Sequence, residues 1–372
     1  MKICLNPYIE GSGVGTYTLE LARYLSKNSE HEIVVIGDKK LENPEYNIKV
    51  FESPKQRSFF FEIPPFSWFY GPYQDYLISE LVNKIKPDIF HTSDHLAFNR
   101  VKCPTISTGW DYPKGLLECV KLALNYEKKS LLLYRIIREI EMSIKDWLAI
   151  KKVKKVLCVT NHVKQNIGNK GIFLPPGINI QKNNEKKFER LTLTFIGRNH
   201  IWIKRKGLKY LLDALSLIEK YCKIDYDLVL IGKIPSKFKK VLANYKTIRS
   251  HIKLKGLLSR ENTLNIIKKS HLLVAPSLYD EFNFGVLEAL SCGIPVIASK
   301  YNYSFQDMIG HNETGILVNI YDKKQFAKEL FNLIQNKTKL NILSKNTVKR
   351  VKEKYSWEVL VPKILEVYEH YL

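Results

Sequence analysis

The stretch HLLVAPSLYDEFNFGVLEALSCGIPVIASK, residues 271–300, holds two short apolar runs with an amphipathic segment between them. The runs LLVAP and PVIAS are typical of buried strands, and FGVLEALSC, followed by Gly293, predicts a helix. The order strand, helix, strand predicts a parallel α/β unit. Asp280 lies in the turn before the helix, and Glu288 follows eight residues later on the helix itself.

The start of this predicted helix is suited to a ligand that carries phosphate. Free N–H groups at a helix N-terminus favour anions, and carboxylates nearby suit sugar hydroxyls. The stretch therefore has groups for both halves of a nucleotide sugar. A purely structural role stays open at this point, because apolar strands flank helices in every parallel α/β protein and a Glu on a helix is usually solvated.

The segment PSLYDEFNFGVLEALSCGIPVIAS resembles the signature of the retaining GT-B glycosyltransferases of family 4. That signature has an acidic residue, an aromatic–Gly pair, a Glu eight residues after the first, and then A-x-x-x-G-x-P-V. Asp280 replaces the usual Glu, and Asn283 stands at the glycine of the pair, with Gly285 two residues later. The resemblance implies an α/β chain with the GT-B fold, in which two Rossmann-like doubly wound domains face a central cleft.

Length and charge set broad limits on the protein. A chain of 372 residues exceeds the usual size of one core, so we expect two domains. The net charge of +22 should attract anions such as nucleotide diphosphates, anionic lipid surfaces or, non-specifically, nucleic acid. We expect a cytoplasmic protein without a spanning helix or signal peptide. Its six scattered cysteines predict core thiols rather than disulfides or zinc ligands.

The N-terminal segment KICLNPYIEGSGVGTYTLELARYLSK predicts a strand, a glycine-rich turn and a helix. Glycines at 11, 13 and 15 let a ligand approach the backbone. The turn resembles the GGxGxY loop of the family, with Tyr17 at the aromatic position, and that loop faces the diphosphate and the acceptor. The spacing does not fit the G-x-G-x-x-G motif of a dinucleotide site, which argues against NAD.

His91 follows the predicted strand DIF at the position where the family pattern D-x-x-H places a histidine near the sugar and the acceptor. A structural role for this histidine stays open. The segment CPTISTGWDYP resembles the family segment P-x-x-x-T-x-H-D, except that Trp110 replaces the histidine before Asp111. The contacts of that histidine must then come from another residue or be absent.

Two further segments have open explanations. Residues 51–76 crowd aromatic residues and prolines together with Lys55 and Arg57, and residues 116–155 have helical periodicity with many basic residues. Both are explained by packing, the first as core beneath a loop and the second as a helix that covers the sheet. Aromatic and basic residues together also suit a lipid interface, and the first segment suits an acceptor cleft.

A domain boundary is expected where PPG, residues 175–177, precedes the polar stretch QKNNEKKFER. It resembles the family's P-x-G-x-D linker, with Asn179 in place of the acidic residue. We predict an acceptor-binding domain over 1–176 and a nucleotide-sugar-binding domain over 177–356. By resemblance, the last helix, 357–372, packs back on the first domain.

The second predicted domain begins with a strand, a loop and a helix in LTLTFIGRNHIWIKRKGLKYLLDAL. Gly197, Arg198, Lys206 and Gly207 resemble the family pattern G-R-(x)n-K-G, whose basic pair binds the sugar diphosphate. A guanidinium and an ammonium together can neutralise a departing diphosphate. Lys204 and Arg205 compete with Lys206 for this role, since all three are adjacent.

The remaining motifs of this domain follow two later strands. Gly232 leaves room for the nucleotide, and the backbone around Gly256 and Leu257 meets the base by resemblance. Asp225 and Asp227 form a D-x-D, a motif that binds metal in another glycosyltransferase fold. Here the pair opens a strand, and we expect neither a metal nor a cofactor.

The resemblance implies retaining transfer of a hexose from a UDP- or GDP-sugar to a hydroxyl of a glycan, a lipid-linked acceptor or a protein. Glu288 would bind the ribose, Asp280 the sugar, Arg198 and Lys206 the diphosphate, and His91 the acceptor. Residues expected to line the substrate site are Gly13, Gly15, Gly197, Gly232, Leu257, Phe282, Asn283, Phe284 and Gly285. The alternative is a non-catalytic protein that binds nucleic acid or an anionic membrane on a degenerate scaffold, although nucleic acid is not the partner we expect.

Overall fold

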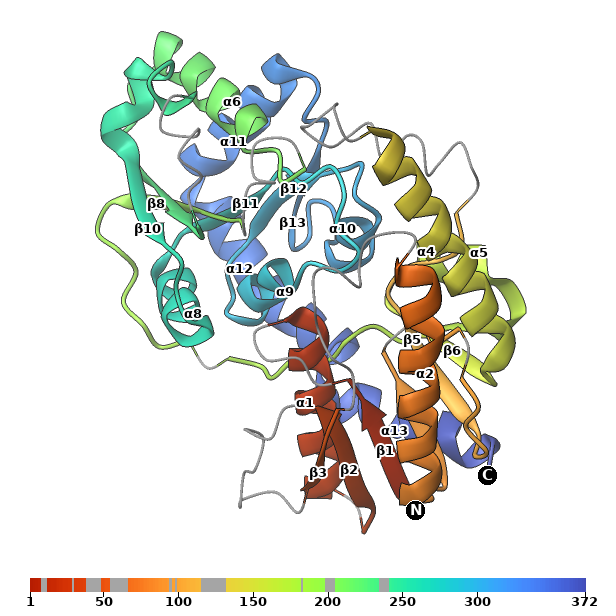
Figure 1. Cartoon of the computed structure of the whole chain (residues 1–372). Helices are drawn as coiled ribbons and strands as arrows, with labels where there is room; N and C mark the ends of the chain where they lie inside the picture. The colour runs from red at the N-terminus through yellow and green to blue at the C-terminus, as the bar shows by residue number, and fades with distance from the viewer. Residues whose placement is uncertain are drawn as a thin grey trace. The chain divides into compact units, whose positions relative to one another are not determined.

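The structure is a computed structural model of the chain. It describes residues 1–7, 12–28, 30–37, 48–53, 66–93, 96–97, 99–114, 132–181, 183–197, 205–233 and 241–372. Side chains at 28, 66–71 and 135 are also outside the description. The described residues form two compact units (Figure 1). The first ends at Gly177 and includes Trp357–Leu372, and the second holds Ile178–Ser356.

The first unit is built on a parallel sheet whose described strands follow the order β3-β2-β1-β4-β5-β6-β7. Its strands are β1 (Lys2–Asn6), β2 (Glu32–Gly37), β3 (Ile48–Glu52), β4 (Ile89–Thr92), β5 (Thr105–Gly109), β6 (Lys155–Cys158) and β7 (Gly171–Phe173). Its helices are α1 (Gly13–Asn28), α2 (Phe66–Ile85), α4 (Leu132–Lys152), α5 (Asn161–Ile167) and α13 (Trp357–His370).

The second unit repeats this design with the described strand order β10-β9-β8-β11-β12-β13, again parallel. Its strands are β8 (Leu191–Ile196), β9 (Tyr226–Ile231), β10 (Ile252–Gly256), β11 (Leu272–Ala275), β12 (Val296–Ser299) and β13 (Gly315–Val318). Its helices are α6 (Leu208–Tyr221), α8 (Arg260–Lys269), α9 (Phe284–Ser291), α10 (Tyr303–Met308), α11 (Lys323–Gln335) and α12 (Lys337–Lys354).

Both faces of the second sheet are covered, which explains why its central strands are continuous apolar runs. On β11, Leu272 and Val274 face a core formed with α6 and α11, whereas Leu273 and Ala275 face a core formed with α8, α9 and α12. Successive side chains alternate between these cores because a strand has a period of two. Each sheet also reverses its strand order once, next to β1 and next to β8. In such sheets the crevice at the reversal holds the ligand.

The helix α13 returns to the first unit through the linker. The indole of Trp357 packs directly on Gly177, where an added Cβ would lie 2.4 Å from the ring. The same indole stacks on Tyr24 of α1, with the ring centroids 5.7 Å apart. Only glycine fits beneath this ring, so Gly177 lets the linker pack closely against the start of the last helix. None of the helices described in Figure 1 is long and apolar enough to span a membrane.

Three local expectations need correction or restriction. Gly13 and Gly15 lie in the first turn of α1 rather than before it, because Ser12 Oγ accepts the Gly15 N–H (2.9 Å) and caps the helix. Cys222 is exposed where α6 ends and is no core thiol, whereas Cys4, Cys158 and Cys292 are buried. Cys119, with most of 51–65 and all of 115–131, is outside the described residues.

Candidate active site

The candidate site lies at the carboxyl ends of β8 and β11, the two strands that flank the reversal in the second sheet. The segments after these strands meet through a backbone hydrogen bond from Leu278 N–H to Arg205 O (2.9 Å). Gly207 makes this approach possible. Its φ of +70° is in the left-handed region, and an added Cβ would lie 2.0 Å from Pro276 O. The glycine of the K-G pair is therefore required by the backbone itself.

Asp280 is the buried acid at this junction. Lys206 Nζ donates to its Oδ1 (2.7 Å), and Asn283 Nδ2 donates to its Oδ2 (2.9 Å). Arg205 is farther away, with Nη2 3.4 Å from Oδ1. Burial alone would raise the pKa of Asp280, but the charges of Lys206 and Arg205 outweigh burial and hold this pKa below its usual value. The carboxyl group is thus ionised and points its charge at two cations.

The structure brings together two residues that the sequence assigned to different parts of a ligand. Lys206 was expected at a diphosphate and Asp280 at a sugar, yet they form an ion pair whose side chains are 15% and 4% exposed. Arg205, the adjacent competitor, also donates through Nε to Tyr279 O (3.1 Å). A ligand that binds both residues must break the hydrogen bond between Lys206 and Asp280. Arg198 and Lys204 are outside the described residues.

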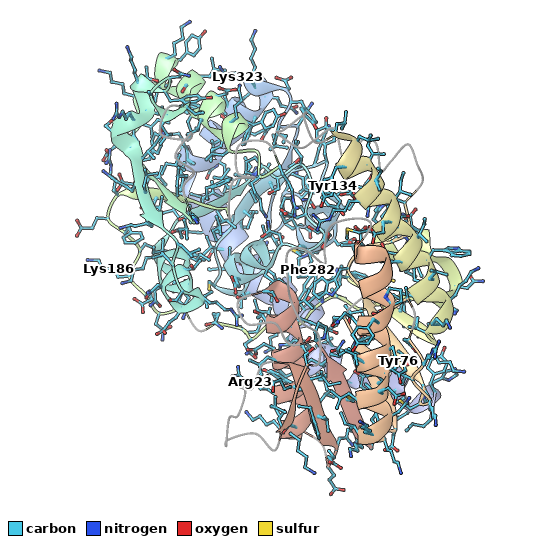
Figure 2. The ribbon with its side chains drawn as sticks, viewed as in Figure 1. Arg23, Tyr76, Tyr134, Lys186, Phe282 and Lys323 are labelled. Atoms are coloured by element: carbon cyan, nitrogen blue, oxygen red, sulfur yellow. The ribbon has the colours of Figure 1, made fainter. Side chains whose placement is uncertain are left out.

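The helix α9 begins beside this pair. Asn283 caps it, because its side chain accepts the Val286 N–H (3.2 Å), and its backbone is extended with φ −101°. Asn283, which stands where the family signature has a glycine, therefore does not adopt a positive φ. Phe282 and Phe284 flank the cap with their rings in edge contact, 5.1 Å between centroids (Figure 2 labels Phe282). A Cβ on Gly285 would lie 3.3 Å from Asn283 Oδ1, so glycine keeps the cap uncrowded.

Glu288 lies in the body of α9 and is buried, with 8% of its surface exposed. Arg260 at the start of α8 donates through Nε to its Oε1 (2.7 Å). This partner was missed from the sequence, in which 28 residues separate the two and no motif links them. The only sequence signal is that Arg260 follows the Gly256–Leu257 segment that was expected to meet the base.

The glycines expected to leave room for a nucleotide all lie at the same edge of the sheet. Gly197 follows β8 and donates its N–H to Ile231 O (2.9 Å), and Gly232 follows β9 and donates to Gly256 O (2.6 Å). Gly232 has φ +128° and Gly256 has φ +70°. Leu257 comes next and is 68% exposed. Among the described residues, the glycines add no side chain to this edge beside the acidic and basic groups.

The D-x-D pair at the start of β9 is held by an arginine that no sequence motif links to it. Arg190 donates through Nε to Asp225 (2.6 Å) and through Nη1 to Asp227 (2.7 Å). Both carboxylates lie at the amino end of the strand, whereas the site lies at the carboxyl ends. Within the described residues, no group of three or more His, Cys, Asp or Glu side chains could hold a metal ion.

In the first unit, His91 lies inside a buried chain of hydrogen bonds. Its Nδ1 forms a hydrogen bond with the hydroxyl of Tyr368 from α13, and its Nε2 lies 2.7 Å from Thr108 Oγ1. Thr108 in turn donates to the hydroxyl of Tyr17 (3.2 Å). Burial lowers the pKa of His91 to about 3 and raises that of Tyr17 to about 12. A contact between His91 and an acceptor stays a prediction, and it would require the ring to release a partner.

The position of the missing family histidine has become part of an aromatic core. Trp110 is 6% exposed and packs edge-on against Tyr17, with 5.5 Å between ring centroids. Trp357 also lies against Tyr17, with 5.9 Å between ring centroids. The neighbouring Asp111 forms an ion pair with Lys114. The substitution thus places a packing side chain where the family pattern has an imidazole.

Two family models match this chain. The model of the glycosyl transferases group 1 matches residues 178–350, and that of Glycosyltransferase Family 4 matches residues 11–182. The chain belongs to the group 1 and family 4 glycosyltransferases. The two matches meet at the linker, so this family 4 chain carries both domains of its family in the expected order.

Relatives and solved structures support the same assignment. The chain is 28% identical over 222 residues to an uncharacterized glycosyltransferase of Methanocaldococcus jannaschii, covering 58% of this chain and 59% of that protein. It is 29% identical over 198 residues, 52% of this chain and 50% of the relative, to the UDP-Gal:alpha-D-GlcNAc-diphosphoundecaprenol alpha-1,3-galactosyltransferase of Escherichia coli. The chain thus spans little more than half the length of these relatives.

A glycosyltransferase from Rickettsia africae has a similar solved structure, with a TM-score of 0.72 at 20% identity. The alignment covers 99% of this chain and 97% of that one. At this identity the likeness shows the fold alone. It confirms the predicted GT-B fold with two Rossmann-like domains.

The buried His91 predicts a pH-dependent stability for this family 4 protein. The unfolded chain binds a proton near pH 6.5 whereas the folded chain does so only near 3, so stability should be lost as the pH falls from 6.5 toward 3. One such group contributes about 1.4 kcal/mol per pH unit in this window. We expect His91→Gln to reduce the change in the free energy of unfolding between about pH 6 and about pH 5, measured by urea unfolding, by the contribution of this one histidine.

The matched control is His370→Gln, which replaces an exposed histidine two residues after Tyr368. It should retain the wild-type slope. Equal slopes for wild type and His91→Gln would show that His91 takes up its proton in the folded protein as readily as in the unfolded chain.

Proposed function

We propose that this protein transfers a hexose from a UDP-sugar to a hydroxyl of a lipid-linked glycan, with retention at the anomeric carbon. The name of the Escherichia coli relative, which gives both UDP-Gal and a diphosphoundecaprenol acceptor, supports this donor and this acceptor class. Retention is taken from the resemblance to the family 4 signature. GDP-sugars and soluble glycans are the competing substrates within the same reaction type.

The observation that carries the proposal is the Lys206–Asp280 pair at the strand reversal, next to the capped start of α9. An ammonium and a helix N-terminus are together suited to a diphosphate, since both present positive charge. A buried, ionised carboxylate accepts hydrogen bonds from sugar hydroxyls. One junction of two loops therefore offers groups of both signs next to one another.

The remaining roles follow from position along the same edge. Glu288 would accept hydrogen bonds from the ribose hydroxyls, with Arg260 holding its carboxylate in place. The base would lie against the backbone at Gly256 and Leu257. Arg198 would add a second cation at the diphosphate. These assignments place the nucleotide across the carboxyl ends of β8, β9 and β10, as expected for a doubly wound sheet.

In the proposed reaction, the bond between the anomeric carbon and the β-phosphate oxygen breaks while the acceptor oxygen bonds to the same face of that carbon. The departing UDP takes the proton of the acceptor hydroxyl. Lys206 stabilises the negative charge that develops on the leaving oxygen, which lowers the barrier because the group is in place before the charge forms. Neither a metal ion nor a cofactor takes part in this proposal.

The test is hydrolysis of UDP-, GDP- and ADP-hexoses combined with thermal unfolding in the presence of each nucleotide. We expect UDP to raise the unfolding temperature most, since a ligand bound only by the folded state stabilises it. UDP-hexose should be hydrolysed slowly, at a rate that EDTA leaves unchanged. Full loss of the rate in EDTA and its recovery with Mn²⁺ would overturn the metal-free mechanism. Failure to bind or hydrolyse any of the three would favour the non-catalytic alternative.

A further inference from the structure

The helix α4 has a row of apolar side chains at the surface and two buried polar side chains on its inward side, beside the buried Ala149. Leu133, Ile137, Ile144 and Trp147, which we call the α4 stripe, are 72%, 38%, 54% and 50% exposed. On the other side, Ser143 and Asp146 are 8% and 4% exposed. A helix that covers a sheet in a soluble protein normally has the reverse arrangement. Figure 2 labels Tyr134 near one end of this helix.

The inward polar face has its own partners and cannot simply be rotated outward. Ser143 Oγ accepts the Lys114 N–H (2.6 Å) and donates to Lys114 O (2.8 Å). The Lys114 ammonium forms an ion pair with Asp111 and is also attracted by the charge of Asp146. Burial would lower the pKa of Lys114, but these two charges outweigh burial and raise it. The orientation of α4 is therefore fixed by hydrogen bonds and charge, and the apolar side chains are left at the surface.

The stripe is continuous along the helix. Its members are spaced 4, 7 and 3 residues apart, and the half-buried Ile140 fills the seven-residue interval. Side chains at such spacings lie above one another on one helix face. At 1.5 Å per residue the stripe extends for about 20 Å. A continuous exposed apolar surface of this length indicates a binding site for a partner that covers one face of the helix.

Basic groups lie at the end of the stripe. Lys151 Nζ is 3.3 Å from the ring centroid of Trp147, and Lys151 and Lys152 are both exposed. Arg138 is exposed farther along the helix. Trp and Leu on one face combined with Lys and Arg beside it are typical of helices that lie in the interface of a membrane. The partner that matches both apolar and basic groups is an anionic lipid surface.

We propose that the α4 stripe inserts into the interface of an anionic membrane leaflet, with Lys151 and Lys152 at the lipid headgroups. A second copy of this chain is the rival occupant, since the spacing also suits a helix pair. Charge argues against it, because a dimer would bring together two chains of net charge +22. This membrane contact goes beyond the proposed function and involves none of its site residues.

The experiment is co-sedimentation of the full chain with vesicles of phosphatidylcholine alone or mixed with phosphatidylglycerol. We expect binding only to the mixed vesicles, weakened by salt because exposed charges are screened. The double substitution Ile144→Ser/Trp147→Ser should lower the fraction bound about tenfold or more. Its control is Tyr221→Ser, which removes a 73% exposed aromatic beside a lysine on α6 and should bind as the wild type does.

The charge contribution is tested by Lys151→Gln/Lys152→Gln, matched with Lys323→Gln/Lys324→Gln, two adjacent exposed lysines on α11. Only the first pair should lower binding to mixed vesicles. Equal binding by all variants, or no binding to either vesicle, would overturn the proposal. A wild-type dimer in light scattering that the stripe variant converts to a monomer, without lipid binding, would assign the stripe to a second copy. Failure of the donor proposal would leave these readouts unchanged, because no nucleotide is added.

Discussion

Replacing Lys206 with Met should lower the rate of hexose transfer by about a hundredfold or more. The ammonium is 15% exposed and bonded to Asp280 beside the start of α9, so a donor that separates this pair would have the positive charge at its diphosphate before the reaction begins. Met retains the length of the side chain but removes its charge. The rate should fall at saturating donor, since the charge matters most while the leaving oxygen gains its negative charge. The measurement is kcat with UDP-hexose and the acceptor found for this chain.

Lys206 also neutralises a buried carboxylate, and the two roles must be separated. Lys206→Met leaves Arg205, at 3.4 Å, as the charged partner of Asp280 among the described residues, which should destabilise the second domain. The double variant Lys206→Met/Asp280→Asn removes both charges and should regain most of that stability. Its activity should stay low, because it lacks both the Lys206 charge at the diphosphate and the Asp280 carboxylate at the sugar. Recovery of the rate in the double variant would show that Lys206 only neutralises Asp280. Lys209→Met, at an exposed ion pair with Asp213, is the control and should keep full activity.

Replacing Gly207 with Ala should destabilise the second domain by about 3 kcal/mol or more and abolish donor binding. A methyl group at this position would lie 2.0 Å from Pro276 O, a backbone atom that cannot rotate away. The loop after β8 would have to withdraw from the loop after β11, which breaks the bond between Arg205 O and Leu278 N–H. Lys206 would then leave Asp280. Urea unfolding measures the first effect, and the thermal shift with UDP measures the second.

Gly256→Ala is the matched control for this prediction. Gly256 has the same φ of +70° and lies in the same domain, but an added Cβ meets nothing within 4 Å. Gly256→Ala should lower the free energy of unfolding only by the cost of placing an alanine in the left-handed region, about 1–2 kcal/mol. The difference between the two variants measures the close approach of the loops. Equal destabilisation by the two substitutions would refute the requirement for glycine at 207.

Several features of this protein followed from local patterns in the sequence. The strand, helix and strand over 271–300 formed as β11, α9 and β12, because apolar runs of this length are buried whatever their neighbours are. The linker at 175–177 separates the two compact units, as its Pro-Pro-Gly sequence and the polar stretch after it predicted. Motif glycines such as Gly207 were also evident, since a residue without a Cβ is conspicuous where a strand leads into a helix.

The sequence by itself determined the GT-B class, the order of the two domains and the segments that contribute the candidate site. Only the tertiary structure decided which side chains pair there: Lys206 with Asp280, Glu288 with Arg260, and His91 with a tyrosine 277 residues away. It also decided that the four apolar side chains of the α4 stripe lie at the surface. Secondary structure depends on residues a few positions apart, which a sequence displays directly. A pairing between distant side chains depends on where the packed sheet brings its loops together, and no local spacing records that.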